Sequence, residues 1–192
     1  TVNIDEGRQY RFGEVTLLGD MVVPQEELEA LLTISEGSMF SQQALIESVE
    51  AIRDRLGEAG YAFAAIDSVP ELREDEGVAN LTFFIDPGSR VYVRRINISG
   101  NQRTDDEVIR REFRQMEGGW FSNERIRTSR TRLNQLGFFD QVEIEPRQVA
   151  GEADQVDLDV TVQEGLSGSF QAGVGYGSGS GFLIDISLSQ DN

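Results

Sequence analysis

Carboxylates are the side chains in this sequence whose type and spacing could do chemistry. The chain holds 34 Asp and Glu residues, and paired acids occur at Asp105-Asp106 and at Asp157 and Asp159. Two neighbouring carboxylates could serve a glycosidase or hold a cation. However, acids in the first turn of a helix are ordinary partners of the helix dipole, and Asp157 and Asp159 fall on the outer face of a predicted strand. Chance pairs are expected among so many acids, so we predict neither a catalytic site nor a metal site.

Other reactive residue types are missing from the chain. It has no Cys and no His, and all 17 of its cations are Arg. This composition excludes thiol nucleophiles, imidazole relays, Cys/His metal sites and lysine Schiff bases. The segments Glu36-Gly37-Ser38 and Glu117-Gly118-Gly119 do not match a phosphate loop, because no Lys follows them and no strand precedes them. The formal charge of −17 disfavours nucleic acid as a partner. We therefore expect a protein that is not an enzyme and that binds no cofactor.

A group of charges occupies one short segment of the second half. Its members are Arg110, Arg111, Arg114 and Glu117. Such charges can form a solvated helix face with local ion pairs, which contribute little to stability, or a docking patch for another protein. Adjacent helix positions face different ways, so the four side chains do not share one face. The residues by themselves leave both interpretations open.

Aromatic residues follow these charges. Trp120 and Phe121 could line a ligand pocket, but we predict that they fill the core between two helices. Met39 and Phe40 occupy the same place earlier in the chain and are expected to do the same.

An internal repeat organises the sequence. A shift of 81 residues superposes 15–20 on 96–101 and 36–41 on 117–122, and a shift of 77 superposes 56–61 on 133–138. The change of shift means that about one helical turn is missing from the second copy. Asn3 to Gly7 repeats the end of the pattern once more. We expect full units at 8–88 and 89–166, with 1–7 as the end of a preceding unit.

Each unit is predicted to run strand, helix, helix, strand, strand. In the second unit 91–98 is β-rich, Thr104 and Glu107 form a capping box that opens a helix, and Ser122 caps the next helix, which Gly137 ends. The apolar faces expected for these two helices are Val108, Ile109, Phe113 and Met116, and then Ile126, Leu133 and Leu136. Val156, Leu158, Val160 and Val162 alternate as a half-buried strand does.

In the first unit Pro24 suits the first turn of a helix, and Leu45, Val49, Ile52 and Leu56 line the helix after it. Two helices on one face of a three-stranded sheet give an α+β fold.

The tail after Gly165 has a different composition. Apolar residues alternate with small or polar ones over 169–176 and again over 182–189, around a Gly/Ser turn. This pattern is typical of transmembrane β-barrels and also of a soluble amphipathic hairpin. Because an isolated hairpin is unstable in water, we expect 167–192 to be the first, incomplete strands of a barrel.

The run from Arg110 to Trp120, Arg-Arg-Glu-Phe-Arg-Gln-Met-Glu-Gly-Gly-Trp, resembles the signature of the last POTRA domain in the BamA family, the bacterial outer-membrane β-barrel assembly proteins. The segment 133–139 fits the same pattern, and 168–177 followed by 190–192 resembles the opening of that family's barrel. The similarity covers essentially the whole chain. It implies that the units are the fourth and fifth POTRA domains. The strong acidity is a departure from the family that does not disturb the motif residues.

The resemblance also implies a function. The chain would be the periplasmic scaffold of the machine that inserts β-barrel proteins into the outer membrane. It would lie on the periplasmic side of that membrane, with its barrel portion in it. The family's last POTRA domain contacts the accessory lipoprotein BamD, and Glu117 matches the contact glutamate. Arg110 is expected to dock BamD together with Glu117, and Arg111 and Arg114 are further members of this patch. Other lipoproteins of the complex and unfolded outer-membrane proteins are further implied partners. The alternative is the POTRA region of a related translocation or secretion pore.

A sheet edge is a second candidate binding feature. A three-stranded sheet has two edges with unpaired N–H and C=O groups, to which a client strand could add. The candidate edge in the second unit is 138–145, and its members of interest are Phe138, Phe139, Val142 and Ile144. Its counterpart in the first unit is 61–69. Alternatively, a neighbouring unit or the linker at 88–90 covers the edge.

Overall fold

The computed structural model describes residues 8–165, 169–177 and 181–189. The first unit contains five elements, and they are β1 (Arg11–Gly19), α1 (Gln25–Glu29), α2 (Gln42–Glu58), β2 (Ala65–Arg73) and β3 (Val78–Asp86). The second unit repeats them as β4 (Tyr92–Ser99), α3 (Asp106–Glu112), α4 (Asn123–Gln135), β5 (Phe139–Gln148) and β6 (Gln155–Glu164). The predicted strand-helix-helix-strand-strand order and the α+β class are confirmed.

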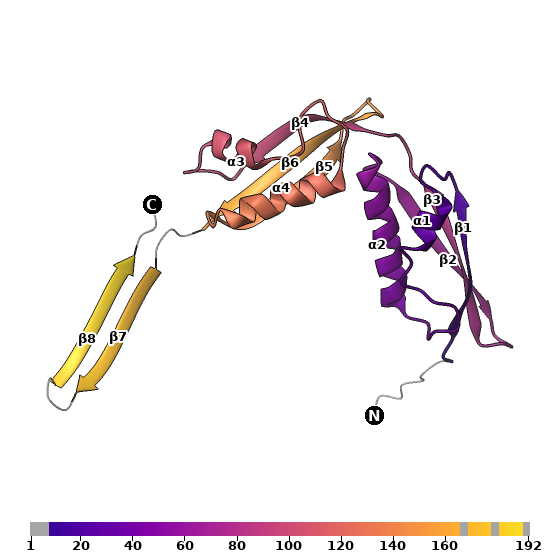
Figure 1. Ribbon diagram of the computed structural model, residues 1–192, viewed down its shortest axis with the longest axis horizontal. Helices are drawn as coiled ribbons and strands as arrows, with labels where there is room; N and C mark the ends of the chain where they lie inside the picture. Colours follow the sequence, from indigo (N-terminus) through magenta and orange to yellow (C-terminus); the bar gives the residue numbers. More distant parts are fainter. Residues whose placement is uncertain (1–7, 166–168, 178–180, 190–192) are drawn as a thin grey trace.

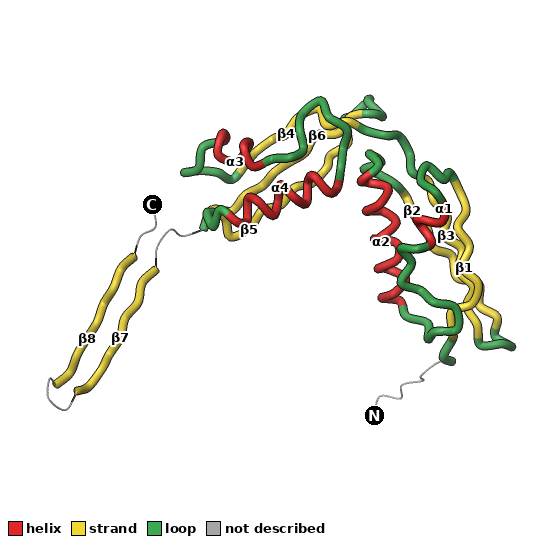
Figure 2. The backbone as a smooth tube through the Cα atoms, viewed as in Figure 1, coloured by secondary structure: helices red, strands yellow, loops and turns green. Residues whose placement is uncertain are grey.

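Both sheets have the same topology. The strand order is β1-β3-β2 in one and β4-β6-β5 in the other, so the last strand of each unit lies in the centre. The central strand runs parallel to the first strand and antiparallel to the second. Figures 1 and 2 show the long helix of each unit covering one face of its sheet. Each sheet therefore has one face on a core and two edges.

The core of each unit lies between the sheet and the long helix. The central strand β6 buries Val156, Leu158, Val160 and Val162, as their alternation predicts. Helix α4 covers them with Ile126 and Leu133, and Ile52 and Leu56 on α2 do the same in the first unit. Met116, which we assigned to the apolar face of the helix before it, is 64% exposed. That assignment was wrong because α3 ends at Glu112 and Met116 lies in the loop beyond.

Helix α4 begins and ends where the sequence predicts, and α2 begins in the same way. The Ser122 side chain accepts a hydrogen bond from the N–H of Arg125, and Ser41 accepts one from Ala44 at the matching place. Gly137 follows α4 with a φ of 71°, a conformation that favours glycine. The predicted capping box at Thr104 was wrong. Helix α3 has Asp105 as its N-cap without a side-chain hydrogen bond, because the Thr104 N–H donates to Glu164 instead.

The two units are joined by direct contacts as well as by the linker. Asn123 at the start of α4 donates to Asp54 on α2 at 3.1 Å, and Arg127 lies 3.8 Å from Glu58 and 4.0 Å from Asp54. The Val91 N–H donates to the Gly60 carbonyl at 2.9 Å. Figure 1 shows the units meeting at an angle, with α2 and α4 on the inner side of the bend.

The tail forms a hairpin of β7 (Ser169–Gly177) and β8 (Gly181–Ser189), paired antiparallel from Ser169↔Ser189 to Gly177↔Gly181. Its two strands were predicted from the alternating pattern. Residues 1–7, expected to end a preceding unit, lie outside the described residues. Within the described ranges, no helix has both the length and the apolar character that a membrane span requires.

Candidate functional site

The segment after α3 folds back onto the edge of β4. The N–H of Gly118 donates to the Val93 carbonyl at 2.7 Å, the N–H of Val93 donates to the Gly119 carbonyl at 2.9 Å, and the N–H of Phe121 donates to the Val91 carbonyl at 3.1 Å. Gly118 takes a φ of 75°, which lets the chain turn here. The part of the signature that follows α3 is therefore fixed to the sheet by its backbone, although it belongs to no helix or strand.

Arg110 and Glu117 lie together beside this segment. Glu117 Oε1 accepts the N–H of Ile96 on β4 at 2.8 Å and lies 3.4 Å from Arg110 Nη1. Arg110 Nη2 donates to the Ile96 carbonyl at 3.0 Å. Both side chains remain about half exposed, at 46% and 47%. The structure thus places a charged pair at the surface and ties it to the strand edge.

The other two predicted members lie apart from this pair. Arg111 is 3.4 Å from its neighbour Glu112, whose carboxylate also receives Arg132 at 2.7 Å. Arg114 is exposed, and its backbone N–H, not its guanidinium, donates to Ser129 at 2.8 Å. Only Arg110 and Glu117 therefore form a joint surface feature.

Trp120 lies at the surface, half exposed, and its assignment to the core was wrong. Met39 in the first unit is 46% exposed as well, so the same assignment fails there. Phe121 is buried as predicted. The reason is geometric, because the segment is extended where it pairs with β4, and successive side chains then point to opposite sides.

Aromatic and cationic side chains accompany Trp120 at the surface. The Arg90 guanidinium stacks over the Trp120 ring at 4.4 Å, and Tyr92 meets the same ring edge-on at 6.4 Å between centroids. Such a cation–π contact holds the linker against the second unit.

Gln115 is a supporting residue that the sequence analysis missed. It is fully buried, and its Nε2 donates to the Trp120 carbonyl at 3.0 Å. Its repeat counterpart is Ile34, so a polar residue stands at an apolar core position. That contrast between the two units is the signal that could have identified it.

Ionic contacts cover the outer face of the second sheet. Arg94 binds Asp157 through two hydrogen bonds of 2.8 and 2.6 Å, and Arg147 binds Asp159 at 2.6 Å. Asp157 lies on the outer face of its strand, as expected, and it is buried because the two Arg side chains cover it. The hydrogen bond from Arg94 lowers the pKa of Asp157, and that from Arg147 lowers the pKa of Asp159. Asp157 and Asp159 are therefore both held as ionised partners of Arg side chains, a state that does not suit a general acid.

Strand β5 lies at an edge of the second sheet. Phe139, Val142 and Ile144 point into the core, whereas Phe138 precedes the strand and is half exposed. This edge is not fully open, because Arg130 Nη2 on α4 donates to the Ile144 carbonyl at 3.3 Å.

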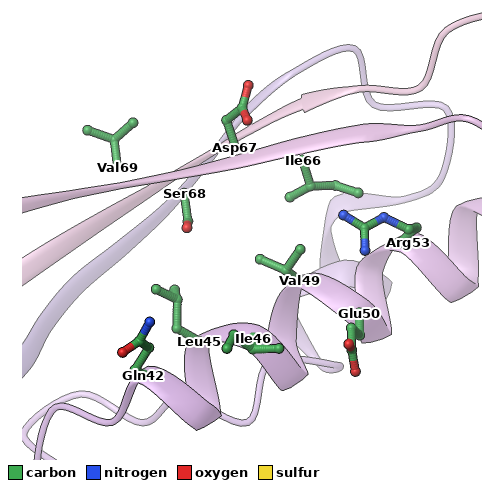
Figure 3. Close-up of a pocket in the computed structure, with 10 residues that line it drawn as sticks. All are labelled: Gln42, Leu45, Ile46, Val49, Glu50, Arg53, Ile66, Asp67, Ser68 and Val69. Carbon is green, nitrogen blue, oxygen red and sulfur yellow. The ribbon is translucent and has the colours of Figure 1, made fainter.

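Strand β2 is the equivalent edge in the first unit, and a groove of about 690 Å³ lies beside it. Figure 3 shows the groove between α2 and β2, with Leu45, Ile46 and Val49 on one side and Ile66 and Ser68 on the other. Val49 stands where Arg130 stands in the second unit. The Arg130 side chain that binds the Ile144 carbonyl of β5 therefore has a shorter, apolar counterpart beside β2.

Within the described parts of the chain, no three acidic side chains gather in a way that could hold a metal ion. The arrangement offers contact surfaces, namely the Arg110–Glu117 pair and the β2 groove.

Comparison with known proteins gives a consistent result. The model of the POTRA family, described as surface antigen variable number repeat, matches residues 10–88 and 91–165. The outer membrane protein assembly factor BamA of Neisseria meningitidis serogroup B is 35% identical over all 192 residues, which make up 24% of that protein. The BamA of Buchnera aphidicola is 29% identical, again over the whole chain and 31% of the relative. The chain thus spans about a quarter to a third of these relatives.

Solved structures agree with the sequence comparison. The crystal structure of Haemophilus influenzae BamA POTRA3-5 matches with a TM-score of 0.78 and 32% identity, covering 83% of this chain and 63% of that one. BamA from Haemophilus ducreyi lacking POTRA domains 1-3 matches with a TM-score of 0.71 and 37% identity, covering 95% of this chain and 35% of that one.

Proposed function

Because this chain belongs to the POTRA family, we propose that it is the periplasmic scaffold of a machine that assembles β-barrel proteins into the bacterial outer membrane. The observation that carries the proposal is the whole-chain similarity to BamA, which includes both units and the tail. BamA relatives are named as assembly factors, so a secretion pore is not favoured, and an enzymatic role has no support in those names.

We also propose the domain assignment that the resemblance implied. Residues 8–88 and 89–166 would be the fourth and fifth POTRA domains, since BamA lacking the first three covers 95% of this chain. Residues 1–7 would end the third, and 167–192 would open the barrel. The alternating pattern of the hairpin supports the last assignment, and two of its apolar residues, Val174 and Phe182, are 77% and 79% exposed.

Docking of BamD is assigned to the surface at Glu117 in the second unit, where Arg110 lies beside it. The pair is fixed to the sheet and still half exposed, which suits a preformed contact surface. Arg111 and Arg114 would lie at the rim of this surface, since neither shares the contacts of the pair. The partner would carry a cation opposite Glu117.

The test is a charge reversal at Glu117. We expect Glu117→Lys to weaken binding of the chain to immobilised BamD about tenfold, and the loss to shrink at high salt because the pair is half exposed. Stability should fall by about 1–2 kcal/mol, because the Ile96 N–H loses its acceptor. Glu36→Lys, at the equivalent position of the first unit, is the control and should bind normally. Equal binding of Glu117→Lys and the unaltered chain at low salt would refute BamD docking at this site.

Unfolded outer-membrane proteins would bind as added strands. We propose β2 as the main site, because the groove lies beside this edge, and β5 as a weaker one, because Arg130 occupies the Ile144 carbonyl. Backbone pairing demands little of the client sequence, which suits a machine that handles many clients.

A further inference from the structure

The Ile96 peptide groups on β4 have unusual partners. Strand β4 is an edge of its sheet, and both the N–H and the C=O of Ile96 bind side chains instead of a strand. The N–H goes to Glu117 and the C=O goes to Arg110. The two side chains thus give Ile96 one hydrogen-bond acceptor and one donor, as a neighbouring strand would do for a residue paired with it. The two side chains also contact each other, at 3.4 Å.

The first unit lacks this arrangement. Its counterparts of Ile96, Glu117 and Arg110 are Val15, Glu36 and Glu29. Glu29 accepts a hydrogen bond from Gln25 instead, and in the described residues neither Glu29 nor Glu36 bonds the backbone of Val15. We call the contacts of Glu117 and Arg110 with the Ile96 peptide groups the clamp. The first unit folds without a clamp, so the stability of the fold alone does not explain why the second unit has one.

The clamp restricts the Glu117 carboxylate in a particular way. Oε1 takes both described hydrogen bonds, and no described residue donates to Oε2. One oxygen is thus tied to the strand, and the side chain as a whole is 47% exposed. A Glu side chain that is already fixed loses less conformational entropy when a partner binds it.

We propose that Arg110 and the Ile96 N–H are positioning groups that hold Glu117 with Oε2 outward, ready for a cation of the docked lipoprotein. Arg110 then acts on docking through Glu117 and does not touch the partner. This inference rests on the proposed function, because it concerns the same docking site. Pre-positioning one side chain of this kind is expected to strengthen binding about 2- to 10-fold.

Amide exchange and affinity together test the proposal. In Glu117→Gln the side-chain carbonyl still accepts the Ile96 N–H, so exchange at Ile96 stays slow while affinity for BamD and its salt dependence fall. In Glu117→Asp the charge remains but the side chain is one methylene shorter. Exchange at Ile96 should then accelerate, and affinity should fall about 2- to 10-fold. Glu36→Gln and Glu36→Asp are the matched controls and should change neither quantity.

A double-mutant cycle assigns the role of Arg110. Arg110→Ala should weaken BamD binding in the unaltered chain and have no further effect in the Glu117→Gln background. Equal effects in both backgrounds would mean that Arg110 contacts the partner directly, and this would overturn the inference. Unchanged Ile96 exchange in Glu117→Asp would overturn it as well, without any partner present. If the unaltered chain fails to bind BamD, the proposed docking function falls together with the positioning role.

Discussion

At the scale of single residues, the Glu164 carboxylate at the end of β6 is held by several hydrogen bonds. It accepts the backbone N–H groups of Arg103 and Thr104, the shortest at 2.7 Å, and the guanidinium of Arg103 at 3.3 Å. Desolvation by itself would raise the pKa of Glu164, but these hydrogen bonds outweigh it and lower the pKa to about 2. The ionised acid therefore holds the loop before α3 against the sheet.

This pKa predicts a dependence of stability on pH. The folded pKa of Glu164 lies below the ordinary value of 4.5, so the stabilisation is complete above that value and is lost as the pH falls towards 2. In Glu164→Gln, we expect lower stability at pH 7 and a shallower decline between about pH 4.5 and 2. Urea denaturation followed by circular dichroism at several pH values measures both.

Glu107→Gln is the matched control, because Glu107 is exposed in the first turn of α3 and has no described hydrogen bond. Its pH profile should follow that of the unaltered chain. A Glu164→Gln profile that keeps the full acid dependence would contradict the assignment.

At the scale of elements, the two equivalent edges β2 and β5 differ in access. Each carries a proline at the same register, Pro70 opposite Leu81 and Pro146 opposite Leu158, so the strands superpose closely. Arg130 bonds the carbonyl of β5, whereas Val49 leaves a groove beside β2. The two edges therefore differ at one equivalent helix position, which holds Arg130 beside β5 and Val49 beside β2.

A reciprocal exchange tests this. We expect a peptide of alternating apolar residues to shift the NMR signals of 65–73 in the unaltered chain. Arg130→Val should add shifts along 139–148, because the Ile144 carbonyl becomes free. Val49→Arg should reduce those along 65–73, because the longer side chain fills the groove. NMR titration measures all three.

Arg130→Ala provides a second opening variant in case Val at this position repacks the helix. Shifts confined to the helix faces in every variant would rule out strand addition at both edges.

At the scale of the whole molecule, the relation between the units depends on a small polar junction. Asp54 and Glu58 at the end of α2 face Asn123 and Arg127 at the start of α4. These side chains are largely exposed, and each such ion pair contributes on the order of 0.2–1 kcal/mol. Gly57 adjoins them, and a Cβ there would clash with the side-chain amide of Asn123.

Arg127→Glu should therefore loosen the junction without unfolding either unit. The new carboxylate would repel Asp54 and Glu58, and the units would sample a wider range of angles. Residual dipolar couplings measured separately for the two units would then no longer fit one alignment tensor, while the amide shifts within each core stay unchanged.

Arg125→Glu lies on the same helix and has no described contact with the first unit, so it controls for the change of charge. A single tensor that still fits both units in Arg127→Glu would show that the backbone contact of Val91 with Gly60 suffices.

The sequence by itself determined the repeat, the order of elements, the α+β class and the family. These follow from local signals that do not depend on distant contacts. Val156 to Val162 alternate with the period of a strand, Ser122 and Gly137 bound a helix, and the 81-residue shift relates one unit to the other. The identity of the Arg110–Trp120 signature is likewise a property of consecutive residues.

Only the tertiary structure decided which side chains meet. Trp120 was expected in the core, but its segment pairs with β4 and leaves it half exposed. Met116 was expected on the apolar face of a helix, but α3 ends at Glu112 and Met116 lies exposed in the loop beyond. Asp157 is buried because Arg94 and Arg147 reach over it from the two flanking strands. Arg110 and Glu117 are seven residues apart and meet at Ile96. Such contacts depend on strand register and loop path, which packing fixes only after distant segments come together.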